Sequence, residues 1–347
     1  MKILNLFLGI AAIGLFSACE KKDFSVNSDK KEEVTVVYGL LNPDVRQQYI
    51  KVYKGFLTEG SAYEAAKDPG FYSYADSIDV CVEEYNGQKL IRSIAFDTTT
   101  SIPKDSGLFA YPGQILYTAQ VKLNRNYRYV LIVKNKYSQK VITSETNIVG
   151  DVYVTYPPLN LSKEISFPES DLRLKYKHKE GVEPSCYEAY YFYYYTEVMA
   201  DGSSVQREPV VWYVGEDFSA TPRMTIPYHG ETFYQKIAEK ITDSRDVKSR
   251  HTDSIVLYLY KGGEDLYKYI SANTAGTGLN QERLHYTNIR SYATPADYAE
   301  KREDHLSTGI FSSKGIMRVT FRDLAIVSRD SLFQGRFTGH LKFTDVY

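Results

Sequence analysis

The amino-acid sequence predicts a mainly β protein, in which an N-terminal immunoglobulin-like β-sandwich is followed by a second β-rich domain with a few short helices. Tyrosine is unusually frequent, with 32 residues among 347 against 4 methionines and 1 tryptophan. Tyrosine favours strands that have a half-exposed face. Short stretches of alternating apolar and polar residues recur along the chain and are separated by turn residues, which is typical of sandwiches built from many short strands.

Residues 1–18 predict a bacterial lipoprotein signal peptide. Lys2 supplies a positive start, and the apolar run over residues 3–16 is too short to span about 30 Å of hydrocarbon. The run ends on two small residues directly before Cys19, as a secretory signal does. Phe16 stands three places before the cysteine, where an aliphatic residue is usual. We expect Cys19 to be acylated; an ordinary cleaved signal with an incidental cysteine is the alternative.

A charged segment follows this cysteine. Residues 19–32 carry many charges and almost no apolar side chains, so we expect a flexible, solvated tether. Because more than one acyl chain makes detachment negligible, the sequence predicts a protein anchored to the outer membrane without spanning it. Whether it faces the cell surface or the periplasm stays open.

The first domain is expected over residues 33–150. Asn86-Gly87 is a strong hairpin signal, and Ser61 with Glu64 has the spacing of a capping box that opens a short helix. The strand around Tyr129 resembles the late strand of immunoglobulin-like folds, in which a tyrosine braces a corner. We expect strands at residues 34–41, 48–56, 77–85, 88–96, 115–123, 127–135 and 140–148, with 115–123 and 127–135 paired to each other.

The second domain is expected over residues 151–347, after a boundary marked by Pro157-Pro158. An amphipathic pattern predicts a helix at 231–241, and further helices are expected after Gly262-Gly263 and at 294–302, where Thr294-Pro295 forms a start signal. Strands are expected at residues 171–177, 187–198, 205–214, 254–261, 315–321 and 336–343.

An aromatic run, Tyr190-Tyr-Phe-Tyr-Tyr-Tyr195, lies in the second of these strands. Side chains alternate between faces, and the phenylalanine favours the face of Tyr190, Phe192 and Tyr194 as the buried one. The opposite row, together with the single tryptophan, is then a candidate contact patch for sugars or for a partner protein. The interpretation that we favour over this patch is a strand buried on both sides, or covered by the helices. The candidate residues are Tyr191, Tyr193, Tyr195 and Trp212.

The sequence contains no recognisable catalytic, cofactor or metal signature. The six histidines are scattered and show no metal-ligand spacing, and no Gly-x-Ser-x-Gly motif occurs. Gly276-Thr-Gly278 lacks the third glycine of a dinucleotide loop. A formal net charge of −1 gives no electrostatic reason to expect nucleic acid. Cys81 and Cys186 are expected to be free thiols, with a disulfide as the alternative.

Four short motifs resemble those of an uncharacterised lipoprotein family of Bacteroidetes. They are Val37-Tyr-Gly-Leu-Leu41, Gln48-Tyr-Ile-Lys-Val52, Tyr286-Thr-Asn-Ile289 and Ser307-Thr-Gly-Ile-Phe-Ser312. The resemblance implies a two-domain β-rich envelope protein, in a family whose members are often found alongside TonB-dependent outer-membrane receptors and have no established activity. The last two motifs lie closer together in the family pattern, so residues 290–306 are an insertion in this chain.

These observations favour a non-enzymatic binding protein, or an accessory component of an outer-membrane uptake system, whose partner is a TonB-dependent receptor. A surface glycan-binding protein is the first alternative, and it would show an exposed row of aromatic rings on the second domain. The second alternative is a hydrolase, which would need carboxylates from distant segments to converge in a cleft. A scaffold or adhesin without a small ligand is the third.

Replacing Cys19 by alanine tests the anchor. In cells fed an alkyne-tagged fatty acid, we expect the unaltered chain to take up the label and to sediment with membranes. Cys19→Ala should abolish the label and release the protein, because only this thiol is expected to carry the acyl chain. Cys81→Ala is the matched control and should keep both properties; labelling that survives Cys19→Ala would contradict the assignment.

Overall fold

The structure of the protein is a computed structural model that describes residues 33–55, 61–107, 113–159, 163–179, 185–219, 223–274 and 285–345. The predicted signal peptide, tether and Cys19 therefore lie outside the described residues. Within the described part, strands predominate and the helices are short, which confirms the mainly β prediction. No helix in these ranges is long and apolar enough to cross a membrane.

Two layers of strands enclose a first core. β1, β2 and β5 form one layer, and β3, β6 and β7 form the other. β4 pairs with β3 in its first part and with β5 over residues 97–99, so it passes from one layer to the other at a corner of the sandwich. The strands are β1 (Val34–Leu41), β2 (Gln47–Gly55), β3 (Ile78–Asn86), β4 (Lys89–Thr99), β5 (Leu116–Gln120), β6 (Arg128–Asn135) and β7 (Val141–Asn147).

One predicted pairing in this sandwich is wrong. β5 and β6 do not pair with each other, because β5 pairs with β2 and β4 while β6 pairs with β3 and β7. The turn between them connects the two layers. The Tyr129 hydroxyl braces this turn, since it accepts from the Asn124 backbone N–H at 2.7 Å and donates its proton to the Glu84 carboxylate at 2.5 Å. The corner-bracing role expected for a tyrosine of this strand is thus confirmed.

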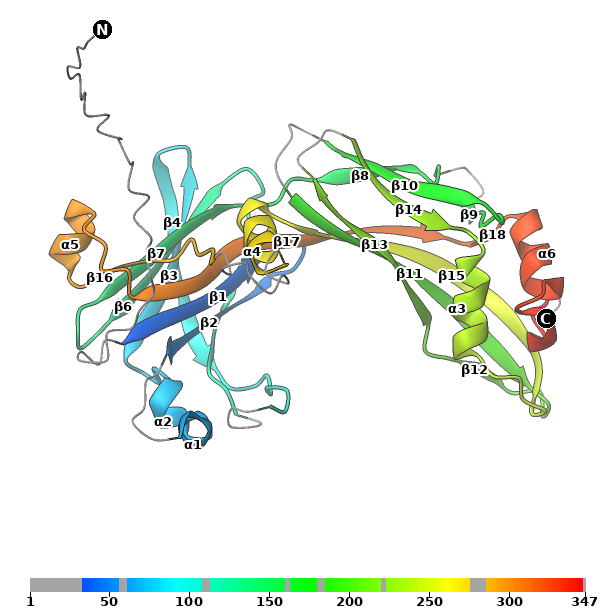
Figure 1. Ribbon diagram of the computed structural model, residues 1–347, viewed down its shortest axis with the longest axis horizontal. Helices are drawn as coiled ribbons and strands as arrows, with labels where there is room; N and C mark the ends of the chain where they lie inside the picture. The colour runs from blue at the N-terminus through cyan, green and yellow to red at the C-terminus, as the bar shows by residue number, and fades with distance from the viewer. Residues whose placement is uncertain are drawn as a thin grey trace, which may run out of the picture. The chain divides into compact units, whose positions relative to one another are not determined.

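A second core lies between a three-stranded sheet and a larger one (Figure 1). β8, β10 and β14 form the smaller sheet, and β13, β11, β15 and β17 face it, with α3 packed against the same core through Phe233 and Ile237. Short β12 (Ser204–Gln206) continues the larger sheet. The remaining bounds are β8 (Val152–Tyr156), β10 (Asp171–His178), β11 (Ser185–Met199), β13 (Val210–Ser219), β14 (Arg223–His229), α3 (Thr232–Lys240), β15 (Val247–Gly262) and β17 (Ser307–Phe321).

The C-terminal strand predicted at residues 336–343 is wrong. Helix α6 (Ile326–Gln334) ends just before this region, which contains a 3₁₀ turn (Gly339–Leu341), and Phe343 makes only an isolated bridge to Arg250. The Thr338 hydroxyl donates to the Leu332 carbonyl at 2.7 Å and holds the chain back against the end of α6. The other elements are α1 (Ala62–Ala66), α2 (Pro69–Tyr72), β9 (Glu164–Ile165), α4 (Glu264–Thr274), β16 (Arg290–Tyr292), α5 (Pro295–Glu300) and β18 (Asp323–Leu324).

β17 contributes to both cores. Its residues 307–313 pair in parallel with β1, and residues 314–321 pair antiparallel with β15. Phe311 accordingly lies in the first core and Phe321 in the second. The boundary between two domains at 150/151 stays a prediction. Residues after 151 also contribute to the first core, as Phe311 does.

Three of the four motifs on which the resemblance rests, at residues 37–41, 286–289 and 307–312, meet at the start of β17. The Asn288 side-chain amide donates to the Phe311 carbonyl at 2.7 Å, and its oxygen accepts from the Phe311 amide at 3.0 Å. Gly309 has a φ of +110°, and a Cβ at this position would collide with the Val37 carbonyl of β1. Residues 290–306, which the resemblance predicts to be an insertion, form β16 and α5 between the two motifs.

Gly309→Ala is expected to destabilise the fold severely. A side chain would combine an unfavourable positive φ, worth about 1–3 kcal/mol, with a backbone collision that forces β17 away from β1. We expect a loss of at least about 3 kcal/mol in the free energy of unfolding, measured by denaturant titration. Gly107→Ala has open space around the added Cβ and should stay within about 0.5 kcal/mol; equal losses in both variants would contradict the close approach.

Candidate functional site

The candidate contact residues from the sequence are buried. Tyr191 is 1% exposed and Trp212 is 4% exposed, and Tyr193 and Tyr195 also lie in the second core. The Tyr191 ring packs edge-on against Phe167, with 5.2 Å between centroids. The alternation was predicted correctly, but the assignment of faces was wrong, and these four residues are not a surface patch.

Partners outside the strand decide which face is buried. Phe167, before β10, and Phe233, on α3, stack with 4.2 Å between ring centroids on the side of Tyr191 and Tyr193. Phe167 contacts Tyr191, and Phe233 contacts Tyr193 at 5.4 Å. The sequence of β11 alone carries no information about these contacts. The presence of Phe192 therefore does not indicate which face of the strand is buried.

The opposite face of the same strands carries the exposed rings. Tyr190 stands opposite Tyr213 of β13 and Tyr258 of β15 in the strand register. Tyr213 is 47% exposed and Tyr260 is 37% exposed, while the others are half-buried. We call this surface the open aromatic face, and it consists of Tyr190, Phe192, Tyr194, Tyr213, Tyr258 and Tyr260.

The rings of the open aromatic face form a continuous set of contacts. Tyr190 lies 5.1 Å from Tyr213 and 5.6 Å from Tyr260 between ring centroids. Phe192 lies 4.9 Å from Tyr258 and 6.4 Å from Tyr194. Tyr258 lies 6.2 Å from Tyr260, which joins the two groups of rings. These distances are those of favourable offset and edge-to-face aromatic pairs, so the rings support one another and present a broad, preformed surface.

Carboxylates lie between these rings. The Tyr190 hydroxyl donates to Glu188 at 3.1 Å, and the Tyr213 hydroxyl donates to Glu216 at 3.2 Å. Burial and then the charge of Glu216 raise the pKa of Tyr213 to about 12, and burial and Glu188 raise the pKa of Tyr190. Both phenols are therefore neutral at physiological pH and keep their protons as hydrogen-bond donors.

A bulge places Tyr213 and Glu216 on one face. Residues three apart in a regular strand point to opposite sides, but the register with β11 shifts between Ala189 and Tyr190. Gly215 has a φ of +152° at this point. A glycine within a strand often marks such a bulge. Gly215 is therefore the residue from which the bulge could have been predicted.

A positive charge borders the face on the side of β17. The Arg318 guanidinium lies 6.0 Å from the centre of the Tyr258 ring, within the range of a cation–π contact. Ile316, 38% exposed, is the residue of β17 opposite Tyr260. The face thus combines apolar ring surfaces with carboxylate acceptors and a guanidinium donor.

The structure also describes the two cysteines at residues 81 and 186. Cys81 and Cys186 are free thiols, which confirms the preferred interpretation, and burial raises the pKa of the Cys186 thiol to about 11. In the described ranges, no three His, Cys, Asp or Glu side chains gather in a way that would hold a metal ion.

Comparisons with known proteins yield little. No family model matches the chain, and no curated protein matches it. Among solved structures, it is similar to the C-terminal globular domain of an oligosaccharyltransferase from Pyrococcus abyssi, at 10% identity and a TM-score of 0.22. The match covers 64% of this chain and 42% of that chain. A likeness this small carries no argument about fold or function.

Proposed function

We propose that this chain is a lipid-anchored protein of the cell envelope that binds glycans without cleaving them, and that the glycan lies on the open aromatic face. The observation that carries the proposal is the row of contacting rings on β13, β11 and β15, of which Tyr213 and Tyr260 are exposed and the others are half-buried, with Glu188 and Glu216 beside them. Aromatic rings on the surface of the second domain are the feature that favours a glycan-binding protein over the other candidate functions.

The chemistry of a sugar fits both parts of this surface. The C–H face of a pyranose ring is weakly positive, and the π-face of a tyrosine carries negative charge density, so the two stack favourably. The ring hydroxyls of a sugar donate to carboxylates, and each of Glu188 and Glu216 has acceptor capacity beyond the one phenol that it binds. Arg318 can donate to sugar oxygens from the border of the face.

A glycan fits this surface better than a folded protein partner does. The buried centre of a protein interface is depleted of charged residues, whereas here two carboxylates lie among the rings. Burying them against protein would need matched cations. A sugar leaves both carboxylates hydrated at their edges and still covers the rings.

The anchoring part of the proposal depends on Cys19 and on the tether at 19–32. The family resemblance supports a place beside a TonB-dependent receptor in the outer membrane. In that setting, a non-enzymatic protein that holds a glycan near an uptake channel raises the local concentration of the receptor's substrate, because anchoring keeps the two proteins close.

Glycan binding is tested with the full chain in detergent micelles. Calorimetric titration with cellohexaose, xylohexaose, laminarihexaose and mannohexaose is expected to show binding of at least one of them. Tyr213→Ala and Tyr260→Ala should each weaken that binding about tenfold, equivalent to about 1.4 kcal/mol, because each removes a stacking ring. Tyr213→Phe should lose less, because it keeps the ring.

The matched control is Tyr137→Ala, which removes a tyrosine that is 82% exposed outside the open aromatic face. It should bind like the unaltered chain. Equal affinities in all variants, or no binding of any of the four hexasaccharides, would contradict the proposal. Shorter saccharides appearing during incubation would favour the hydrolase alternative.

A further inference from the structure

The charges on the open aromatic face are divided between its two sides. Glu188 of β11 stands directly opposite Glu216 of β13 in the strand register, and both side chains are exposed. Lys314 and Arg318, two exposed cations on this side of the sheet, belong to β17, and β15 lies between β17 and β11. Since neighbouring strands lie about 4.8 Å apart, the backbones of β11 and β17 are about 10 Å apart. In the part of the chain that the structure describes, neither carboxylate makes an ion pair.

Two like charges in opposed positions of a sheet repel each other. Directly opposite side chains of an antiparallel pair lie about 4.5–5.5 Å apart at Cβ, and like charges there are destabilising. Each carboxylate accepts from one phenol, Glu188 from Tyr190 at 3.1 Å and Glu216 from Tyr213 at 3.2 Å, but a neutral phenol supplies no positive charge. A cation placed between the two carboxylates would relieve the repulsion and form charge-assisted hydrogen bonds.

The rings beside the carboxylates favour an organic cation over a metal ion. Tyr190 contacts both Tyr213 and Tyr260, and Glu188 is the residue of β11 opposite Tyr260. A hard metal ion takes about six to eight oxygen ligands, and no cluster of three or more ligating side chains occurs among the described residues. An ammonium group on an organic body is attracted both by the carboxylates and by the π-faces of the rings.

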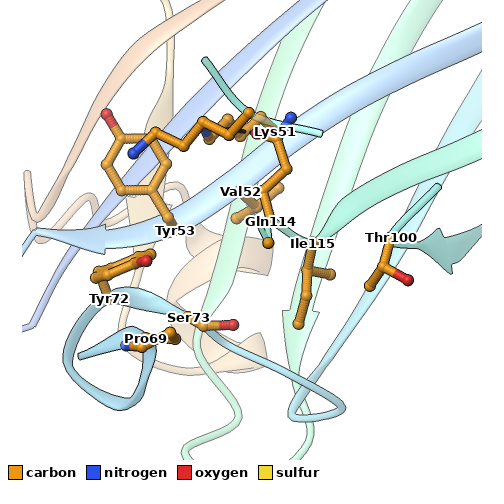
Figure 2. A pocket seen from close by; sticks show the side chains of 11 residues that line it. Lys51, Val52, Tyr53, Pro69, Tyr72, Ser73, Thr100, Gln114 and Ile115 are labelled. Atoms are coloured by element: carbon orange, nitrogen blue, oxygen red, sulfur yellow. Dashed lines mark hydrogen bonds between the residues drawn. The ribbon is translucent and has the colours of Figure 1, made fainter. Parts of the chain in front are cut away.

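The cavity beside the first sheet offers no such place. Its volume is about 450 Å³, and its wall includes Lys51 and, facing it, Tyr72 (Figure 2). No carboxylate lines this cavity in the ranges that the structure describes. An ammonium therefore finds its negative partners on the open aromatic face and not in this cavity.

We propose that the glycan on the open aromatic face carries a protonated amino sugar, whose ammonium lies between Glu188 and Glu216 and whose ring stacks on Tyr213. This inference rests on the proposed glycan binding and names the class of sugar. The amine of such a sugar is bonded directly to a ring carbon, so the ring and the ammonium reach a tyrosine and its neighbouring carboxylate together. Arg318, on the other side of the face, is then left to donate to neutral sugar oxygens.

Three β-1,4-linked disaccharides that differ only at C2 test the proposal by calorimetric titration of the full chain in uncharged detergent micelles. Cellobiose carries a hydroxyl there, the glucosamine disaccharide an amine, and diacetylchitobiose a neutral acetamide. At mildly acidic pH, with the amine protonated and the carboxylates ionised, the amine form should bind about tenfold more tightly than either neutral form, as expected of two exposed ion pairs. Raising the pH until the amine is neutral should abolish this gain and leave the neutral disaccharides unaffected.

Glu188→Gln and Glu216→Gln should each reduce the gain about threefold, because one carboxylate remains in each variant. Both variants keep an oxygen that can accept from the neighbouring phenol, so both should fold. Glu169→Gln is the matched control, since the Glu169 side chain is 72% exposed and lies outside the open aromatic face. It should keep the full gain.

Nα-Acetyl-lysine methylamide carries an ammonium without a sugar ring and should bind no better than cellobiose. Tighter binding of this compound than of the glucosamine disaccharide would overturn the proposal and assign the ammonium to a peptide. Equal affinity for the three disaccharides, or a gain that survives both glutamine variants, would also overturn it. Neutral hexasaccharides that still bind through Tyr213 would in that case leave the glycan surface standing, whereas no binding of any saccharide would remove both proposals.

Discussion

The close approach of β17 to β1 at Gly309 is the constraint on which the rest of the structure depends. Only a residue without a side chain fits there, because a Cβ would collide with the Val37 carbonyl and φ is +110°. With this contact made, residues 307–313 complete the layer of β1, and the next eight residues reach β15. Asn288 fixes the same point by bonding both backbone groups of Phe311.

The same strand leads to the candidate site. Pairing of β17 with β15, and of β15 with β11, sets the register that brings Arg318, Tyr258 and Tyr190 into one cross-strand row. Because the smaller sheet and α3 cover only the opposite side of these strands, the rings in this row stay accessible. Helix α4 packs on the other face at the end near Gly262, and the surface is the part of that face that α4 leaves open.

The positions of most strands could be predicted from the alternation of apolar and polar residues. Contacts between segments that are distant in the sequence could not. Strand positions such as Val34–Leu41 and the cap at Ser61 were predicted because local alternation and side-chain hydrogen bonds determine them. The face that β11 buries was not predictable, because it is decided by Phe167 and Phe233 from distant segments. The residues 336–343 alternate like a strand, but the turn at Thr338 depends on its bond to Leu332.

Hydroxyl-radical footprinting with and without a saturating hexasaccharide tests the central claim most directly, because it reports the accessibility of each tyrosine. In the free protein Tyr213 and Tyr260 should be oxidised, and Tyr191 and Tyr193 should be protected, in line with their burial. The bound glycan should protect Tyr213 and Tyr260 and leave Tyr137 unchanged. Unaltered oxidation of Tyr213 and Tyr260 under saturating ligand would contradict the assignment of the open aromatic face as the binding surface.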